Sequence, residues 1–262
     1  MKETIEKLDY DRLLQSILDI GEEMVVAGAE VGRVEDSIRR MLEAYGCDPE
    51  RINCFIITSN MQVTMVAPDG KIITQIRQIK RYSVNFDRLD YLNDLSRYVV
   101  KNKPGISELR EKYHMVIERK PQPTALWILS GILIAGAFAI FFGGSVWDAA
   151  ASALTGVFVT AVGPLLQRVE KNELVYNFVM SFACGLLAYL LVKVGFGEHE
   201  AAIMMGSIML LIPGIALTNA IRDMLTGDVG SGMIRLVNAL LVAAAVACGF
   251  CLSMYFFGGF VR

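Results

Sequence analysis

Histidine is scarce in this chain of 262 residues, which has only His114 and His199. Two histidines on opposite sides of a membrane, where the topology below assigns them, cannot form a His-based catalytic triad or a His-rich metal centre. The phosphate-binding loop G-x-x-x-x-G-K-[ST] is missing, and no G-x-G-x-x-G follows a predicted strand. This argues against ATP-driven chemistry within the chain. We therefore expect no enzyme activity, no metal and no cofactor.

Cysteine is also too sparse and too irregular to form a disulfide framework. Five cysteines are an odd number, and their spacing fits no disulfide-stabilised scaffold. Cys248 and Cys251 form a C-x-x-C within an apolar stretch. A redox pair is one interpretation, and two small packing residues are the favoured one.

Charge is nearly absent from the second half of the chain. Residues 1–123 carry 39 charged side chains, whereas residues 124–262 carry 13. The change falls at Lys120-Pro121-Gln122-Pro123, which is typical of a short, stiff linker. We predict a domain over 1–120 and a membrane domain over 121–262. The net charge of −2 leaves no basic patch for nucleic acid, so no nucleic-acid partner is expected.

Five apolar stretches follow the linker, each long enough to cross the hydrocarbon core of a lipid bilayer as a helix. They predict an all-α membrane domain of five transmembrane helices. These spans cover residues 124–142, 146–166, 174–194, 201–219 and 233–257.

The basic residues of the loops orient these spans. Arg168 and Lys171 lie between the second and third spans, Arg222 lies between the fourth and fifth, and Arg235 lies at the very start of the fifth. All four fall on the side of the amino-terminal domain, and the charged amino terminus does not resemble a signal peptide. We therefore expect a multi-pass protein of the cell (cytoplasmic) membrane, with a cytoplasmic amino-terminal domain and the carboxyl terminus outside.

The amino-terminal half predicts a small α+β domain. Apolar residues at helical spacing indicate helices over about 11–27 and 31–45. Alternating residues and turn signals at Ser59-Asn60 and Pro68-Asp69-Gly70 predict a three-stranded antiparallel meander over 52–79. Two further helices are expected over about 87–102 and 106–119.

A polar cluster marks the second helix of this domain, at Glu30, Arg33, Glu35 and Asp36. One interpretation is a solvated helix face with intrahelical ion pairs. The other is a contact surface for the membrane helices or for a ligand.

Two predicted spans contain helix-breaking pairs, Gly163-Pro164 and Pro213-Gly214. Proline removes a backbone donor and disturbs the preceding turn, and carbonyl groups freed in this way need other partners in lipid. Kinks that serve packing are one explanation. The other is a substrate site that uses the exposed backbone of both breaks, because paired interruptions mark transporter sites. Asn177 and Asn219 are uncharged polar residues inside the predicted spans and are candidates for the same site.

The segment PGIALTNAIRDMLTGDVGSGMIRL at 213–236 resembles the signature of the threonine/serine exporter family. Three segments of the first half resemble the cytoplasmic domain of that family, and the likeness extends from about residue 11 to the end. These segments are GAEVGRVEDSIRRMLEAYG (28–46), ITSNMQVTMVAPDG (57–70) and TQIRQIKRYSVNFDRLDYLNDL (74–95).

The resemblance implies an exporter of small hydrophilic metabolites, such as threonine and serine, that is driven by the proton-motive force. Some relatives are thought to export dicarboxylates instead. The family also contains a fused form with about ten spans, so five spans resemble the longer chain of the split, two-chain form. The implied partners are an amino acid or small organic acid, protons, the lipid bilayer and a short companion membrane protein of four or five spans.

The resemblance also assigns candidate site residues. We expect Asp223 to couple to protons or to pair with Arg222 or Arg235, and Asn219 to bind substrate. A purely structural ion pair between Asp223 and Arg235 is the alternative. The substrate-binding candidates from the motif are Pro213, Gly214, Asn219 and Asp223, and the polar and helix-breaking residues of the spans add Gly163, Pro164 and Asn177. The coupling or gating candidates are Asp223, Arg222, Gly227 and Arg235, and the soluble-domain motif is Gly28, Glu30, Arg33 and Glu35.

Two other functions stay open from the sequence. The first is a membrane-anchored cytoplasmic hydrolase that uses paired carboxylates, although a simple anchor would need only one or two featureless spans. The second is a membrane subunit whose soluble domain senses a ligand, in which case residues 1–120 alone would bind it.

Overall fold

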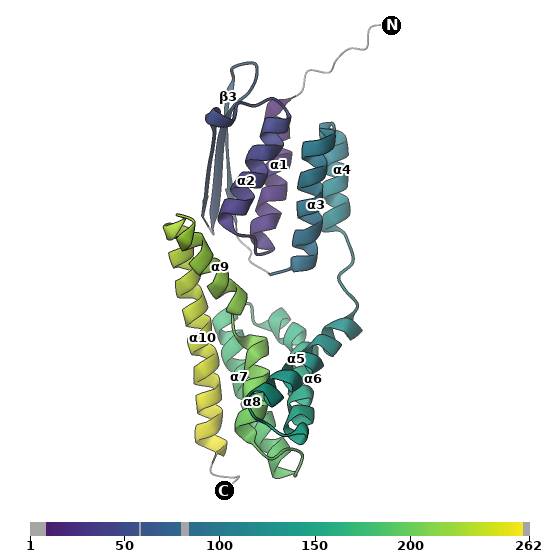
Figure 1. Ribbon diagram of the computed structural model, residues 1–262, viewed down its shortest axis with the longest axis vertical. Helices are drawn as coiled ribbons and strands as arrows, with labels where there is room; N and C mark the ends of the chain where they lie inside the picture. Colours follow the sequence, from purple (N-terminus) through teal and green to yellow (C-terminus); the bar gives the residue numbers. More distant parts are fainter. Residues whose placement is uncertain (1–8, 58, 80–83, 259–262) are drawn as a thin grey trace. The chain divides into compact units, whose positions relative to one another are not determined.

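The computed structural model of the chain describes residues 9–57, 59–79 and 84–258 (Figure 1). The chain divides into two compact units. The first comprises Met1–Lys120 together with Ala216–Leu236, and the second comprises Pro121–Ile215 together with Val237–Arg262. A short segment near the end of the chain therefore belongs to the same unit as the amino-terminal half.

The first unit packs helices against a small antiparallel sheet of order β1-β2-β3. In β2, Met61, Val63 and Met65 are buried on one face, as the alternation predicted. The elements are α1 (Tyr10–Val26), α2 (Val31–Ala44), the 3₁₀ turn η1 (Pro49–Arg51), β1 (Ile52–Ile57), β2 (Asn60–Val66), β3 (Ile72–Gln78), α3 (Phe86–Asn102) and α4 (Ile106–Ile117).

Helix α1 shows why these residues form these elements. The Asp9 side chain accepts hydrogen bonds from the backbone N–H groups of Asp11 and Arg12 at the start of the helix, which satisfies two of its orphan donors. Apolar side chains at helical spacing then face the core of this unit. The completely buried members on α1 and α2 are Leu13, Leu14, Ile17, Leu18, Ile20, Val25, Val31, Val34, Ile38, Met41 and Leu42.

The second unit is entirely helical in its described residues. Helices α5 and α6 come so close that a Cβ added to Gly156 would lie 2.3 Å from the carbonyl oxygen of Gly131. Small residues of this kind let helix backbones approach each other in a membrane. The complete helices are α5 (Thr124–Phe141), α6 (Val146–Val169), α7 (Glu173–Lys193) and α8 (Glu200–Leu211). Helices α9 (Gly214–Leu225) and α10 (Val229–Phe257) are shared between the units, because residues 216–236 belong to the first unit.

The prediction of a helical chain with a three-stranded antiparallel sheet and apolar membrane helices is confirmed. Among the described residues, four helices are long and apolar enough to cross a membrane, namely α5, α6, α7 and α10. A fifth span results if the bent pair α8 and α9 is counted as one broken span.

The two predicted helix breaks differ in the structure. At Pro213, helix α8 ends at Leu211 and α9 begins at Gly214, so the chain is interrupted there. At Pro164, by contrast, α6 continues from Val146 to Val169 without interruption, so the expected break at Gly163-Pro164 is absent. One proline removes a single donor, and the remaining bonds of this 24-residue helix keep it continuous.

Candidate functional site

The motif residues of 213–236 meet those of the α1–α2 turn within the first unit. The side-chain amide of Asn219 donates to the carbonyl oxygen of Gly28 at 3.0 Å, and Arg222 forms an ion pair with Glu30. We call Asn219, Arg222, Asp223 and Arg235, together with the turn residues 28–31, the junction cluster. Two segments 191 or more residues apart in the sequence form it.

Gly28 shapes the turn that receives these contacts. Its φ of +96° lies in the left-handed region that glycine adopts without strain. Its N–H donates to the carbonyl of Val25 at 3.0 Å, and the N–H of Ala29 donates to the carbonyl of Met24 at 3.0 Å, which closes α1. The carbonyl groups of the turn itself accept from elsewhere. Nη2 of Arg235 donates to the carbonyl oxygen of Ala29 at 3.0 Å.

Asp223 completes the first turn of α2. The residue at the N-cap, Glu30, makes no capping hydrogen bond with its own side chain in the described chain. The backbone N–H of Val31 donates to the carboxylate of Asp223 instead. A negative charge at a helix N-terminus is favourable because the first N–H groups have no partner within the helix. A residue of α9 therefore takes the place of a local cap.

Asp223 and Arg235 also form a buried ion pair. Their side chains are only 1% and 3% exposed, and Oδ2 of Asp223 lies 3.4 Å from Nη1 of Arg235. Among the described residues, Oδ2 of Asp223 and both Nε and Nη1 of Arg235 have no hydrogen-bond partner. Each charge therefore depends on the other, because an unpaired charge is costly in a buried position.

Gly227 connects the two helices that carry this pair. Its φ is +104°, and the N–H of Asp228 donates to the carbonyl of Asp223 at 2.9 Å. This is the closing geometry that glycine provides at a helix C-terminus. The turn allows α10 to begin at Val229, so that Arg235 can reach Asp223 on α9.

The start of α10 also contacts the edge strand β1 at Ile56. Ser231 Oγ donates to the carbonyl oxygen of Ile56 at 3.3 Å, and the backbone N–H of Ile56 donates to the carboxylate of Glu35 on α2. Burial, together with the nearby charge of Asp228, raises the pKa of Glu35 above its ordinary value. Backbone groups at a sheet edge need partners or cover, and these side chains provide both.

Sequence reasoning did not single out Ser231, Ala29, Val31 or Ile56. Ser231 stands in the motif, but a lone serine among glycines carries no signal for a particular partner. The other three contribute only backbone groups, which every residue type presents. No pattern in the chain could have identified them.

Arg33 lies beside the junction cluster and lines a cavity of about 150 Å³ together with Glu30, Asn93 and Asn219. It also lines a larger cavity of about 630 Å³ between α2 and α3. Among the soluble-domain motif residues, Gly28, Glu30 and Glu35 take part in the contacts described above. Arg33 lines the cavity beside these contacts.

The remaining candidates occupy separate places. Pro213 and Gly214 form the break between α8 and α9, where a Cβ added to Gly214 would meet no atom within 4 Å. Gly163 packs against Tyr176, whose hydroxyl would lie 2.7 Å from an added Cβ. Asn177 is 6% exposed, and its amide donates to the carbonyl of Glu173 in its own helix at 2.9 Å.

Comparison with known proteins agrees with the resemblance seen in the motifs. Residues 15–257 match the model of the family described as "Putative threonine/serine exporter". The chain is 21% identical over 258 residues to the "Probable threonine/serine exporter" of Mycobacterium tuberculosis, an alignment that covers 95% of this chain and 47% of that protein. It therefore spans about half the length of that relative.

Two shorter relatives are matched over most of their length. The "Probable succinate transporter subunit YjjP" of Klebsiella aerogenes is 24% identical over 241 residues, which is 88% of each protein. The protein of the same name from Escherichia coli is 25% identical over 240 residues, or 88% of this chain and 89% of that protein. No solved structure matches the chain.

Proposed function

Because the chain belongs to the threonine/serine exporter family, we propose that it is a subunit of a secondary exporter of small hydrophilic metabolites, driven by the proton-motive force. The family consists of transporters and not of enzymes, so the hydrolase alternative is dropped. The apolar helices make the chain a multi-pass membrane protein. Within the proposal, the amino-terminal domain is cytoplasmic and the carboxyl terminus, whose last residues 259–262 lie outside the described chain, is outside.

Two substrate classes are supported by the names of relatives. The Mycobacterium protein is named for threonine and serine, and amino acids of that type are the leading candidate. The YjjP proteins are named for succinate, and a dicarboxylate is the second candidate. The lengths support keeping this second candidate, because this chain covers 88% of a YjjP protein but only 47% of the Mycobacterium protein.

A companion chain is part of the proposal. The YjjP proteins are named as transporter subunits, and this chain has at most five spans in its described residues. A short membrane protein of four or five spans would complete a transporter built from two related halves.

The observation that carries the proposal is the junction of a broken helix with the buried cluster. Helix α9 begins immediately after the break at Pro213 and contributes Asn219 and Asp223 to the junction cluster. We propose that the helix break at Pro213 and Gly214 exposes backbone groups that bind substrate. Gly163, Pro164 and Asn177 are further substrate-binding candidates.

The gating role is assigned to the ion pairs of the cluster. Asp223 would break and re-form its ion pair with Arg235 during the proton-coupled cycle. Beside it, the exposed Arg222 pairs with Glu30, whose side chain is 16% exposed. Gly227 supplies the turn between the two helices. The discriminating variant is Asp223→Asn, which keeps the shape of the side chain but removes its charge.

The test is transport in proteoliposomes that contain this chain and its companion. Vesicles loaded with labelled threonine, serine or succinate are expected to release one class faster under a proton gradient, and Asp223→Asn should abolish the dependence on the gradient. Arg40→Gln serves as the control, since the exposed pair of Arg40 with Asp36 lies away from the cluster. Gradient-driven release that is unchanged in Asp223→Asn would show that Asp223 has no coupling role.

The sensor alternative needs a separate measurement. Binding of threonine, serine or succinate to residues 1–120 without any membrane fragment would favour a ligand-sensing subunit. Calorimetry on that fragment distinguishes the two, because the exporter proposal expects no binding there.

A further inference from the structure

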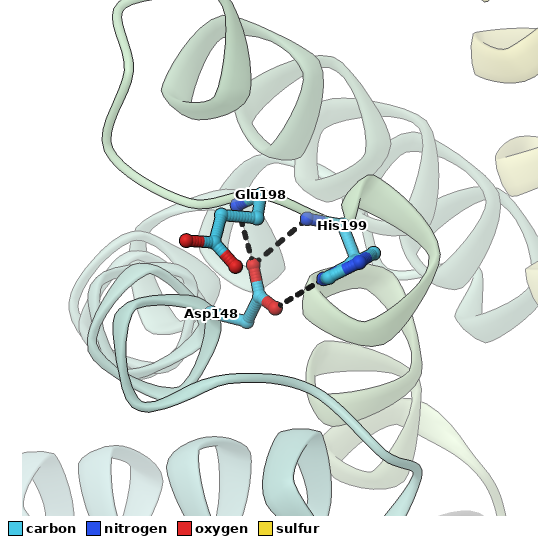
Figure 2. A group of neighbouring side chains, drawn as sticks. All are labelled: Asp148, Glu198 and His199. Atoms are coloured by element: carbon cyan, nitrogen blue, oxygen red, sulfur yellow. Dashed lines mark hydrogen bonds and ion pairs between the residues drawn. The ribbon is translucent and has the colours of Figure 1, made fainter.

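A completely buried carboxylate, Asp148, lies in the first turn of α6 in the second unit. Its Oδ2 accepts from the backbone N–H of Ser145 at 2.8 Å. Its Oδ1 accepts from the N–H of Glu198 at 2.7 Å and from the N–H of His199 at 2.9 Å (Figure 2). A carboxylate offers about four lone-pair positions, so three of them are occupied by fixed backbone donors.

The fourth position faces an imidazole. Nδ1 of His199 lies 2.9 Å from Oδ2 of Asp148. Two lone pairs at this distance would repel, so a proton lies between them and Nδ1 acts as the donor. The second ring nitrogen, Nε2, is then the position that is free to accept a proton. It faces away from Asp148, and the His199 side chain is 63% exposed (Figure 2).

A metal ion is the competing occupant, because ligand atoms of Asp148, Glu198 and His199 lie within 4.8 Å of one another. The bonding of Asp148 opposes it. A cation at this carboxylate would have to displace backbone N–H donors that already hold the loop. The donor set therefore suits a proton better than a metal.

The position of this pair in the topology is informative. Short connections join α5 to α6 and α6 to α7, so these helices alternate in direction. The α5–α6 and α7–α8 connections consequently lie at the same end of the helical unit, remote from Thr124 where the chain enters it. In the proposed topology this end faces outside, where the proton-motive force supplies protons.

We propose that His199, oriented by Asp148, is the proton-accepting site at this end of the membrane unit and takes up the proton that drives export. The inference rests on the proposed function. In the step itself, Nε2 of a neutral imidazole binds a proton and becomes an imidazolium, while Asp148 remains ionised and holds Nδ1.

The surroundings of His199 support this assignment. The hydrogen bond and charge of Asp148 raise the pKa of His199 above its ordinary value, and the charges of Glu198 and Glu200 act in the same direction. Asp148 belongs to α6, Glu198 to the connection and Glu200 to the first turn of α8. A raised pKa favours the protonated imidazole, and histidine is the side chain that most readily changes its charge near neutral pH.

The first experiment measures gradient-driven export by the full chain with its companion in proteoliposomes, with the outer pH varied over about pH 5 to 8. His199→Gln is expected to remove the dependence on outer pH and the gradient-driven component of export. Glu198→Gln is the matched control, because it removes a neighbouring charge but keeps the backbone N–H that binds Asp148. Full pH dependence in His199→Gln would overturn the inference.

The second experiment does not need transport. NMR titration of histidine-labelled full chain in nanodiscs should show His199 with a raised pKa that falls in Asp148→Asn, and His114→Gln assigns the signals. An unchanged pKa in folded Asp148→Asn would overturn the inference. So would saturable binding of Zn²⁺ alone that His199→Gln removes, since a metal would then occupy the site.

The two experiments separate the possible failures. If His199 titrates as expected but the wild-type chain exports no tested solute, the proposed function fails, whereas the pairing of Asp148 with His199 is retained. If export is gradient-driven but indifferent to His199, the proposed function stands and the proton site is wrong.

Discussion

At the residue scale, the junction cluster depends on side chains of one segment that bind backbone atoms of another. The amide of Asn219 and the guanidinium of Arg235 both donate to carbonyl groups of the α1–α2 turn. The carboxylate of Asp223 accepts from the N–H of Val31. The sequence pointed to the side chains, because Asn, Asp and Arg are conspicuous between apolar stretches. It could not identify their backbone partners, because every residue type presents the same backbone groups.

The buried ion pair gives the first prediction. Arg235→Gln leaves the Asp223 carboxylate buried without a countercharge and should destabilise the first unit by roughly 3–5 kcal/mol. Adding Asp223→Asn to it should recover part of this loss, because the two residues interact directly. The labelling rate of the buried thiol of Cys47, followed by mass spectrometry against denaturant, measures the change.

Arg40→Gln is the control for this experiment. Its pair with Asp36 has exposed fractions of 66% and 56%, and exposed pairs contribute about 0–1 kcal/mol. Equal losses in Arg40→Gln and Arg235→Gln would contradict the role given to burial.

Glu35 gives the second prediction. Its raised pKa means that the folded chain binds this proton more tightly than the unfolded chain does. The stabilisation is therefore complete below the ordinary pKa of 4.5 and is lost as the pH rises through the raised value. Glu35→Gln should consequently stabilise the first unit at neutral pH and have little effect in acid.

The same thiol-labelling assay at both pH values checks this sign. Glutamine keeps an oxygen that can accept from the N–H of Ile56, so the backbone contact is retained. A destabilisation that is larger at neutral pH than in acid would show that the charge of Glu35 is favourable in the fold and would contradict the prediction.

At the element scale, the helices followed their sequence signals closely, but the two prolines that were predicted to break helices differ in their effect. Pro213 ends a helix, whereas Pro164 lies within one. Both share the same local chemistry, with glycine as neighbour. The residue types alone could not distinguish them, because the outcome depends on whether the remaining helical bonds and the packing keep the axis continuous.

Helix packing in the second unit gives the third prediction. Gly156→Ala places a Cβ 2.3 Å from the backbone oxygen of Gly131, and a backbone atom cannot move aside as a side chain does. We expect overpacking to lower the free energy of unfolding by about 1–3 kcal/mol. This loss should appear as a lower unfolding temperature of the full chain in detergent. Gly230→Ala on α10 is the control, since its added methyl would meet no atom within 4 Å. Similar unfolding temperatures for both variants would argue against the close approach of α5 and α6.

At the scale of the whole molecule, the chain does not divide at one point. Ala216–Leu236 belongs to the same unit as Met1–Lys120, although the composition changes only once, at the linker near Pro121. The composition of a segment indicates whether it is surrounded by water or by lipid. It does not identify the segments that pack against it. Among the described residues, however, the buried members of the apolar core of the first unit lie between Leu13 and Leu109.

This division gives the fourth prediction. A fragment of residues 1–120 should fold, because it contains that core, but its α1–α2 turn would lack the contacts of α9 and α10. A peptide of residues 214–236 added to it should slow hydrogen exchange at the amide of Val31, which donates to Asp223. NMR-detected exchange measures this protection. A peptide carrying Asp223→Asn should protect less, and equal protection by both peptides would contradict the capping role.

The sequence by itself determined the class of the molecule: a small α+β domain, a set of apolar helices, the family, and the residues that carry its motifs. These properties follow from periodicity, hydropathy and local turn chemistry, which act over a few residues. Only the tertiary structure decided that Asn219, Asp223 and Arg235 hold the Gly28 turn, that Pro164 leaves its helix intact, and that Asp148 orients His199. Such outcomes depend on contacts between segments distant in sequence, where backbone atoms serve as partners and no residue pattern records the pairing.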